Sequence, residues 1–403
     1  MKKKVLITTH TLNIGGVECS FIGLLENLDY EKYDVDVFIY QHHGELFSRL
    51  PPQINLLPEK QSYASLFESV SQVFKKKQGI VFTAKILSHL IFKVRFTKFI
   101  SDPLKHDSYY HPLYNKVASK MLPKISDKKY DVVLAFLHPN FFEANVKAAI
   151  RIAWIHSDYS QLNFDKKLEL EMWSKFNYIA GVSNLNAAAF VQEFPSLQHK
   201  VVVIENILSP DFVHSQSVAL DVAAEMPQNK DGLNILSIGR FTSQKNFDSV
   251  AEISRILKDR GLKFRWYLIG YGSDEALIKK SIYEHGVQEE VIILGKKSNS
   301  YPYIMACDLY IQPSRSEGKA VTVREAQMLG KPVIITDYPS SQSQLENGID
   351  GVIVPLETKR CAEGILKTIQ IPGLLQQLTE NTKNRDYSNT DQLEKIDQLL
   401  NNN

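Results

Sequence analysis

The strongest chemical signal in the chain is a pair of carboxylates around a glycine turn that opens a helix. Glu317-Gly318 follows a predicted strand ending at Gln312, and a predicted helix runs on to about Leu329 with Glu325 about two turns along it. The start of a helix offers unpaired backbone N–H groups and a positive dipole end, where an anionic diphosphate can rest. The two carboxylates can then accept hydrogen bonds from sugar or ribose hydroxyls at either end of one ligand. The same pattern allows Glu317 to be an ordinary helix-start residue and Glu325 a solvated one.

Two cations form the second signal. Gly239-Arg240 and Lys245 follow a predicted strand over residues 235–238. Ligands of open α/β sheets bind at the carboxyl ends of the strands. A guanidinium and an ammonium at that edge can clamp a diphosphate and neutralise the charge of a leaving group. An exposed basic loop is the alternative interpretation.

Two weaker signals follow strands in the first half of the chain. Gly15-Gly16 comes after the first predicted strand, and glycines allow the backbone to approach a ligand closely. His156 ends the segment Trp154-Ile155-His156 and can reach the same edge of the sheet. A plain turn and a structural histidine are the alternatives at these two positions.

Short apolar runs rich in β-branched residues must supply the strands that position these side chains. Runs that are apolar on both faces and separated by helix-like segments favour parallel strands covered by helices. The predicted strands are Val5–Thr9, Val35–Tyr40, Ile54–Leu57, Val132–Phe136, Ile152–Ile155, Tyr178–Val182 and Val201–Ile204 in the first half, and Ile235–Ile238, Trp266–Ile269, Val291–Leu294, Leu309–Gln312, Val333–Thr336 and Val352–Val354 in the second. This alternation predicts an α/β protein with two Rossmann-like, doubly wound domains.

Proline content, periodicity and charge indicate where the domains begin and end. The expected division is an N-terminal domain at 1–206, a linker at 207–232, a C-terminal domain at 233–385 and a tail helix within 386–403. An insert near 61–130 interrupts the first domain. It holds thirteen Lys/Arg and four Asp/Glu, a net charge of +9 in a chain whose total is +2.

Within the insert, cations alternate with large apolar residues over 75–99. The cations are Lys75, Lys76, Lys77, Lys85, Lys93, Arg95 and Lys98. A basic, apolar helix of this kind suits an anionic membrane surface. The alternative is that the apolar side packs on the protein itself.

Length, composition and charge limit the classes of protein to which the chain can belong. The length of 403 residues exceeds one ordinary core, and 44% hydrophobic with 23% charged residues is typical of a globular protein. A net charge of +2 gives no reason to expect nucleic acid as a partner. Three cysteines without a CxxC pattern fit a reducing compartment and predict no zinc site. No apolar run is long enough to span a membrane.

Together these segments resemble the family 4 glycosyltransferases, which have the GT-B fold of two Rossmann-like domains facing across a cleft. The shared motifs are Gly15-Gly16, Trp154-Ile155-His156, Gly239-Arg240 with Lys245, Glu317 with Glu325-Ala326, Gly330-Lys331-Pro332-Val333-Ile334, and Asn347-Gly348 with Gly351. Their order and spacing match over most of the chain, and best over 233–357. Lys319 replaces the bulky apolar residue usual after Glu317-Gly318, which resembles a bacterial capsular and exopolysaccharide-assembly subset and bears on the shape of the sugar pocket.

The resemblance implies a role for each matched residue. The implied catalytic residues are Glu317, His156, Arg240 and Lys245, and the implied donor-binding residues are Gly16, Arg240, Lys245, Lys296, Glu317, Gly318, Lys319, Ala320 and Glu325. Arg240 and Lys245 would hold the diphosphate, and Glu325 the ribose. Glu317 and His156 would contact the donor sugar, Gly16 the phosphates across the cleft, and Lys296 the nucleobase.

The reaction implied by this resemblance is a retaining, metal-independent hexosyl transfer. The sugar would pass from a nucleotide diphospho-sugar, by default UDP-linked, to a saccharide acceptor, and membrane binding by the insert would make a lipid-linked acceptor natural. No cofactor is expected beyond this co-substrate. The departing diphosphate would take the acceptor proton, so the protein supplies charge stabilisation and positioning. We expect a cytoplasmic enzyme of cell-surface polysaccharide biosynthesis, at the inner face of the plasma membrane.

Three other interpretations compete with this one. A GT-A transferase would need an Asp-x-Asp metal site, and Asp34-Val35-Asp36 matches in letters but begins an alternating strand. Another enzyme, either a nucleotide-sugar epimerase or a glycogen-phosphorylase-like enzyme, is possible on fold grounds. A non-catalytic nucleotide-binding partner subunit is the third interpretation. The presence of Arg240 and Lys245 with both Glu317 and Glu325 favours a catalytic protein.

Overall fold

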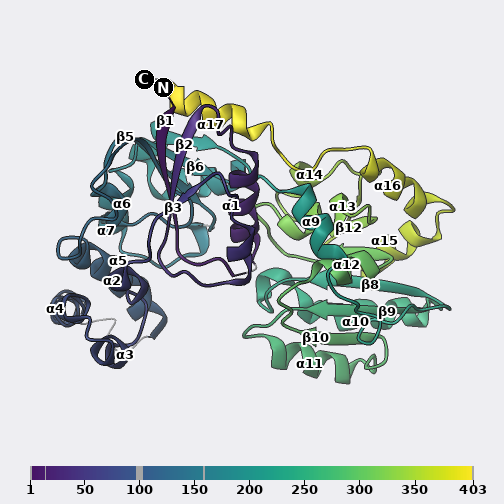
Figure 1. Cartoon of the computed structure of the whole chain (residues 1–403). Coiled ribbons are helices and arrows are strands. Elements are labelled where there is room, and N and C mark those ends of the chain that lie inside the picture. The colour runs from purple at the N-terminus through teal and green to yellow at the C-terminus, as the bar shows by residue number, and fades with distance from the viewer. Residues whose placement is uncertain (1, 14, 97–102, 158, 402–403) are drawn as a thin grey trace. The chain divides into compact units, whose positions relative to one another are not determined.

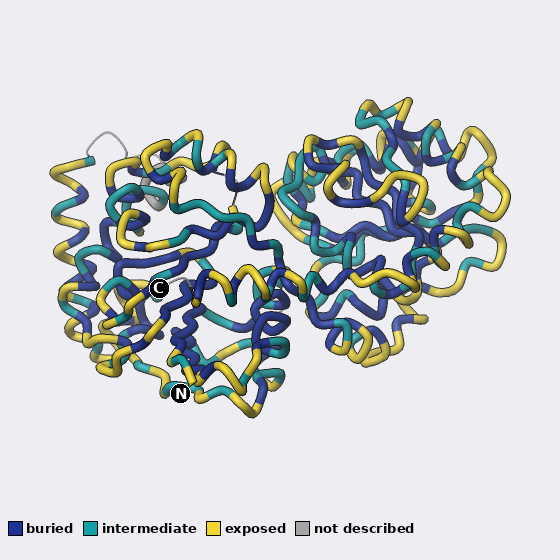
Figure 2. The backbone as a smooth tube through the Cα atoms, turned by 90° about the horizontal axis from the view of Figure 1, so that it is seen from above, coloured by how far each residue is buried: buried dark blue, intermediate teal, exposed yellow. Residues whose placement is uncertain are grey.

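The computed structural model describes residues 2–13, 15–96, 103–157 and 159–401. These residues form two compact units, the first comprising Met1–Ile207 with Thr390–Asn403 and the second Leu208–Asn389 (Figure 1). Each unit is built on one parallel sheet, and its buried residues gather along the strands (Figure 2).

The first unit holds a seven-stranded parallel sheet in the order β3-β2-β1-β4-β5-β6-β7. Its strands are β1 (Lys3–Thr9), β2 (Tyr33–Ile39), β3 (Asn55–Leu56), β4 (Lys129–Ala135), β5 (Lys147–Ile155), β6 (Tyr178–Gly181) and β7 (Val201–Val203). Its helices are α1 (Gly16–Asn27), α2 (Gln61–Ala64), α3 (Val70–Lys75), α4 (Gly79–Arg95), α5 (Pro103–Ala118), α6 (Phe141–Ala144), α7 (Lys166–Trp173), α8 (Asn184–Glu193) and α17 (Gln392–Asn401), with 3₁₀ turns η1 (Glu45–Arg49), η3 (Tyr159–Gln161) and η4 (Pro195–Lys200).

The second unit holds a six-stranded parallel sheet in the order β10-β9-β8-β11-β12-β13. Its strands are β8 (Leu233–Ile238), β9 (Phe264–Ile269), β10 (Val291–Gly295), β11 (Leu309–Gln312), β12 (Val333–Thr336) and β13 (Val352–Val354). Its helices are α9 (Pro210–Ser217), α10 (Val250–Asp259), α11 (Glu275–Glu284), α12 (Tyr301–Ala306), α13 (Val321–Met328), α14 (Ser341–Gln344), α15 (Thr358–Gln370) and α16 (Leu374–Lys383), with 3₁₀ turns η5 (Ser243–Lys245) and η6 (Phe247–Ser249).

Both sheets have the doubly wound strand order, so the prediction of two Rossmann-like sheets is confirmed. In each, the first strand lies in the middle and the order reverses beside it, between β1 and β4 in the first unit and between β8 and β11 in the second. Each run read as a strand from its apolar residues is a strand in the structure. The reversal matters for function because loops leaving the carboxyl ends on its two sides diverge and leave room for a ligand.

The cores explain why those runs are apolar on both faces. Trp266 of β9 is fully buried among Phe241, Phe247 and neighbouring side chains, and its indole N–H donates to Ser237 Oγ at 2.9 Å. The first unit has one cluster around Tyr40 and Tyr63 and another around Trp173. Burial of each large apolar side chain contributes about 1.5–3 kcal/mol.

Two segments differ from the expected domain boundaries. Of the expected linker, residues 208–232 belong to the second unit and contain α9, whose Ser209 cap accepts a hydrogen bond from the Phe212 N–H. The amphipathic C-terminal helix is α17, and it belongs to the first unit, where Ile396 and Leu400 are buried. Tyr33 of β2 donates to Asp397 at 2.7 Å and helps to hold α17 there.

The basic insert forms α2 to α5, and α4 has one buried and one exposed side. Val81, Ala84 and Phe92 are buried, whereas Leu90 and Val94 are 57% and 85% exposed. The inclusion of Lys85 among the surface cations is wrong. Its side chain is buried, its ammonium donates to Leu66 O at 2.8 Å and lies 4.4 Å from the centre of the Tyr114 ring. Residues 97–99 of the predicted membrane segment lie outside the described residues.

Candidate active site

Two loops leave the second sheet on either side of its reversal point. The loop after β8 carries Gly239, the exposed Arg240 and Lys245, and the loop after β11 carries Glu317 before α13 begins. The loops are separated by 72 positions in sequence yet meet at the carboxyl edge of the sheet. The two strongest sequence signals therefore lie in one place.

Lys245 and Glu317 form the central contact of this edge. The Lys245 ammonium lies 2.6 Å from Glu317 Oε1, and the two side chains are 18% and 6% exposed. Ser314 Oγ donates to the same oxygen at 2.6 Å and Gln312 Nε2 at 3.3 Å. All of these contacts reach Oε1, so Oε2 is left for a bound molecule. Charge-assisted hydrogen bonds of this length are the stronger kind.

A second set of contacts ties the two loops together. Arg315 binds both carboxylate oxygens of Asp248, at 2.9 and 2.7 Å. Asn246, whose φ of 59° is in the left-handed region, donates from its side-chain amide to Pro313 O at 2.9 Å. Gln244 accepts a hydrogen bond from the Arg315 N–H at 2.8 Å. These bonds fix the distance between the segment bearing Lys245 and the segment bearing Glu317.

Glycine is required where the β8 and β9 loops pass each other. A Cβ on Gly239 would lie 3.2 Å from Lys245 Cδ, so the lysine stem crosses directly over this residue. Gly270 has a φ of +155°, and a Cβ there would lie 1.9 Å from Gly239 O. Any side chain at Gly270 would displace the backbone that carries Arg240.

The turn before α13 is held by the segment that leads into and forms α14. Ser340 Oγ donates to Glu317 O at 2.7 Å, and the Ala320 N–H donates to Gln344 Oε1 at 2.8 Å. The Lys319 ammonium donates to Ser343 O. Gly318, Lys319 and Ala320 therefore form an ordered turn beside Glu317, and the first N–H groups of α13 have no helical acceptor.

Glu325 is a buried carboxyl group in α13, so the alternative of a solvated residue is wrong. It is 4% exposed, and its Oε1 accepts a hydrogen bond from the Tyr301 hydroxyl at 2.7 Å. Burial raises the pKa of Glu325 to about 7, and the Tyr301 bond offsets only part of that rise. Lys296, by contrast, is exposed, and its ammonium lies 5.2 Å from the centre of the Tyr271 ring.

The residues singled out in the first unit lie at the carboxyl ends of its strands. Gly16 begins α1 after β1, and a Cβ on the preceding Gly15 would lie 2.5 Å from Glu18 Oε2. His156 follows β5, and its Nε2 lies 2.7 Å from Phe136 O. Burial lowers the pKa of His156 to about 4, and its buried Nδ1 has no hydrogen-bond partner among the described residues. His156 is therefore a neutral imidazole with one acceptor atom to spare.

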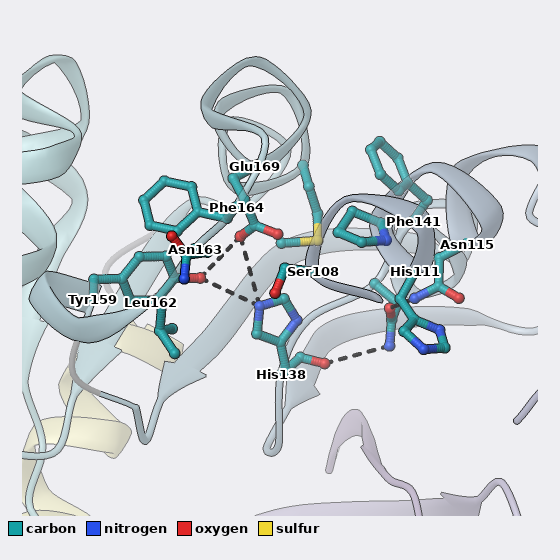
Figure 3. A pocket seen from close by; sticks show the side chains of 13 residues that line it. Ser108, His111, Asn115, His138, Phe141, Tyr159, Leu162, Asn163, Phe164 and Glu169 are labelled. Carbon is teal, nitrogen blue, oxygen red and sulfur yellow. Dashed lines mark hydrogen bonds and ion pairs between the residues drawn. The ribbon is translucent and has the colours of Figure 1, made fainter. Parts of the chain in front are cut away.

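One cluster in the first unit escaped the sequence interpretation. His138, in the loop after β4, lies 3.6 Å from Glu169 Oε2 of α7 and 3.2 Å from the Tyr159 hydroxyl, beside a pocket of about 360 Å³ (Figure 3). The available signal was positional, because His138 follows a strand as His156 does. Glu169 carried no signal, since nothing in the sequence pairs α7 with that loop.

The Asp-x-Asp segment lies in β2 with its second carboxylate bound by neighbouring side chains. Asp36 lies in β2 with its carboxylate bound by Tyr130 at 2.6 Å, Lys128 at 2.9 Å and Asn55 at 2.6 Å. These partners occupy the carboxylate within the first sheet. Over residues 2–13, 15–96, 103–157 and 159–401, no group of three or more His, Cys, Asp or Glu side chains is placed to hold a metal ion.

Part of the chain is similar in sequence to curated proteins. The amylovoran biosynthesis glycosyltransferase AmsK of Erwinia amylovora is 30% identical over 131 residues, which are 30% of this chain and 32% of that protein. The matched segment covers between 28% and 39% of the length of AmsK and two further curated relatives.

Solved structures share the fold over the whole chain. A glycosyltransferase from Rickettsia africae has a TM-score of 0.65 at 18% identity, with 100% of both chains covered. Anabaena Alr3699/HepE, solved in complex with UDP-glucose, has a TM-score of 0.65 at 15% identity, again with 100% of both chains covered. The prediction of a GT-B type chain, with two Rossmann-like domains, is confirmed at the level of fold.

The length and polarity of a helix decide whether it can cross a membrane. Among the described residues, every helix is too short or too polar to cross a bilayer.

The second unit, which holds Arg240, Lys245, Glu317 and Glu325, is also the part of the chain that matches a protein family. Residues 222–385, which lie within the second unit, match the family described as glycosyl transferases group 1.

Proposed function

We propose that the chain transfers a sugar from a nucleotide diphospho-sugar to a saccharide acceptor during assembly of a cell-surface polysaccharide. The observation that carries the proposal is the contact between Lys245 and Glu317 at the reversal point of the second sheet, with the exposed Arg240 on the same loop as Lys245. Cations and a carboxylate at one sheet edge suit a ligand that has both an anionic diphosphate and hydroxyl groups. The glycosyl transferases group 1 match over 222–385 supports the same activity.

In this proposal Lys245 and Arg240 stabilise the leaving diphosphate. The bond between the sugar C1 and the diphosphate oxygen breaks, a bond from C1 to an acceptor hydroxyl oxygen forms, and the hydroxyl proton passes to the diphosphate. Transfer is retaining and requires no metal. Negative charge builds up on the diphosphate, so the two cations lower the barrier by being fixed in place beforehand. The turn at Gly318 and Lys319 and the start of α13 add backbone N–H groups.

Glu317, Glu325 and His156 bind the sugar donor in this account. Glu317 Oε2 takes no part in the contacts of Oε1 and can accept a hydrogen bond from a sugar hydroxyl. Glu325 binds the ribose hydroxyls, and the unpaired Nδ1 of His156 accepts a bond from the transferred sugar. Gly16 contacts the phosphates and Lys296 the nucleobase. A UDP-linked sugar is the first donor to test, a choice supported by the Anabaena structure with UDP-glucose.

A lipid-linked acceptor and a peripheral position at the inner face of the plasma membrane complete the proposal. The exposed side of α3 and α4 combines large apolar residues with cations. Its members are Phe74, Ile80, Ile86, Leu87, Leu90 and Val94, with Lys75, Lys76, Lys77, Lys93 and Arg95. Apolar side chains can enter the headgroup region while cations bind anionic lipids. This surface would hold the enzyme where such acceptors reside.

Release of nucleoside diphosphate tests the activity. UDP-, GDP- and dTDP-sugars are incubated with the full chain, with and without membrane extract as acceptor. The transferase requires the extract for sustained release. An epimerase would convert the sugar donor without it, and binding of nucleotide without turnover would indicate a non-catalytic subunit.

A further inference from the structure

The pocket beside His138 lies at the carboxyl edge of the first sheet, and its lining residues belong to none of the motifs found in the sequence. Its walls come from α5, from the loops after β4 and β5, and from α7, and its volume is about 360 Å³. Pockets for small molecules range from about 300 to 1,000 Å³. This one therefore suits a molecule of one or two sugar rings.

One wall of the pocket presents a carboxylate that is held rigidly by one of its two oxygens. Glu169 Oε2 accepts a hydrogen bond from the Tyr159 hydroxyl at 2.9 Å (Figure 3). It accepts another from the Trp173 indole, also at 2.9 Å. The contact with His138 also reaches Oε2. Glu169 Oε1 takes no part in these bonds, although the residue lines the pocket. Oε1 can therefore accept hydrogen bonds from a molecule that fills the pocket.

A second acceptor on the opposite wall lacks a partner. Asn115 of α5 is 9% exposed and donates through Nδ2 to Asn140 Oδ1 at 2.6 Å. Its Oδ1 is buried and has no hydrogen-bond partner among the residues that the structure describes. An unmet buried acceptor costs about 1–3 kcal/mol, which a bound hydroxyl would recover.

The charges of the pocket argue against an anionic occupant. Burial would lower the pKa of His138, but the Glu169 carboxylate outweighs burial and raises it, and the pKa of Glu169 is lowered in turn by His138 despite its own burial. A protonated His138 cancels the charge of Glu169, and a neutral His138 leaves the pair negative. In neither state does the pair attract a phosphate or a carboxylate. Phe141 and Phe164 supply apolar surface for a sugar ring.

We propose that this pocket binds one uncharged sugar unit of the acceptor, with Asn115 and Glu169 accepting hydrogen bonds from its hydroxyls. Identification of the occupant as an acceptor sugar rests on the proposed function. The pocket itself lies in the first unit, and Asn115 and Glu169 are not among the residues assigned to the sugar donor. Asn115 and Glu169 are then residues that determine acceptor specificity. Donor-binding residues of the second unit play no part in this recognition.

Ligand-detected saturation-transfer NMR on the full chain tests the pocket without any nucleotide. The probes are methyl β-glucoside and methyl β-galactoside, with methyl β-glucuronide as the anionic counterpart. The wild-type chain should transfer saturation to a neutral glycoside and not to the glucuronide. Asn115→Leu and Glu169→Gln should each reduce the signal at least fivefold. Glu171→Gln, two residues away on α7 and paired with Lys116 outside the pocket, should leave it unchanged.

Three results would overturn the proposal: no neutral glycoside binding to the wild type, binding of the glucuronide alone, or unchanged binding in both pocket variants. If a buried substitution prevents folding, Phe164→Ala at the half-buried wall takes its place, and unchanged binding there would count equally against the pocket. A Lys245→Ala chain that binds glycosides normally but releases no nucleoside diphosphate separates the two sites. A wild-type chain that binds glycosides but never turns over a sugar donor would remove the proposed function and keep the pocket.

Discussion

Glu317 Oε1 lies 2.6 Å from the Lys245 ammonium, although 72 positions separate the two residues in the chain. Lys245 is brought in by the loop after β8 and Glu317 by the loop after β11, the two strands that flank the reversal point of the second sheet. The contact joins a cation suited to a diphosphate with a carboxylate suited to hydroxyls. The proposed reaction depends on both groups being held at that edge before the sugar donor arrives.

Arg315 should act by positioning these loops. Arg315→Ala removes the two bonds to Asp248 that link the loop after β8 to the loop after β11. We expect the KM for the sugar donor to rise about tenfold, equivalent to about 1.4 kcal/mol, with a smaller loss in kcat. Arg255→Ala, which removes an exposed pair with Asp259, is the matched control. A loss in kcat alone would argue against a positioning role.

Glu325 should make stability fall as pH rises. The pKa of Glu325 is raised from its usual value of 4.5 to about 7, so the folded state keeps a proton that the unfolded state has lost. Folding is then favoured below pH 4.5, and the advantage disappears as pH rises through about 7. Glu325→Gln keeps an acceptor for Tyr301 and should be the more stable chain at pH 8. Urea denaturation at pH 5 and pH 8 measures this, and parallel changes in both chains would contradict it.

His156 should produce the opposite dependence. Its pKa is lowered from 6.5 to about 4, so the unfolded chain takes up a proton first as the pH falls. Stability is therefore lost from about pH 6.5 down to about pH 4, by on the order of 2–3 kcal/mol for this residue. His156→Gln should flatten that slope in denaturation curves, and substitution of the exposed His199 should not. An unchanged slope in His156→Gln would mean that another group causes the acid lability.

The surface of α3 and α4 should bind anionic membranes. Leu90→Glu with Val94→Glu adds two carboxylates on the most exposed part of α4 without touching its buried side. Flotation with phosphatidylglycerol vesicles at low salt should fall at least fivefold, because each change removes apolar contact and adds repulsion. Leu277→Glu, at a 52% exposed position of α11, is the control. Equal flotation of all three chains, or equal binding to neutral vesicles, would contradict the membrane contact.

The strands could be predicted from short stretches of sequence because each buried strand is apolar on both faces. That pattern lies in the strand's own residues and does not depend on neighbouring elements. The run that became β9 needed only its own residues, such as Trp266, to be recognised. The meeting of Lys245 with Glu317 was also within reach, since parallel strands place their carboxyl ends at one edge. The direct contact between the two side chains could not be predicted, because it depends on loop contacts such as the Arg315–Asp248 bonds.

Contacts between distant helices were beyond sequence reasoning. Lys85 lies in α4, which is apolar on two sides. The sequence of this helix therefore does not predict that Tyr114 of α5 covers the lysine. The pocket formed by Asn115, His138 and Glu169 requires α5, α7 and the loop after β4 to converge. No periodicity in one segment predicts that convergence, since it follows from how the insert packs on the sheet.

Turnover of Lys245→Ala and Arg240→Ala tests the central claim most directly. Initial rates of nucleoside diphosphate release, with membrane extract and a saturating sugar donor, are compared with the wild type and with Lys279→Ala, which removes an exposed cation of α11. We expect a loss of about 10²–10³-fold in kcat for each active-site variant, as for other single electrostatic contributions to a transition state, and no loss for Lys279→Ala. Rates close to wild type in both Lys245→Ala and Arg240→Ala would contradict it.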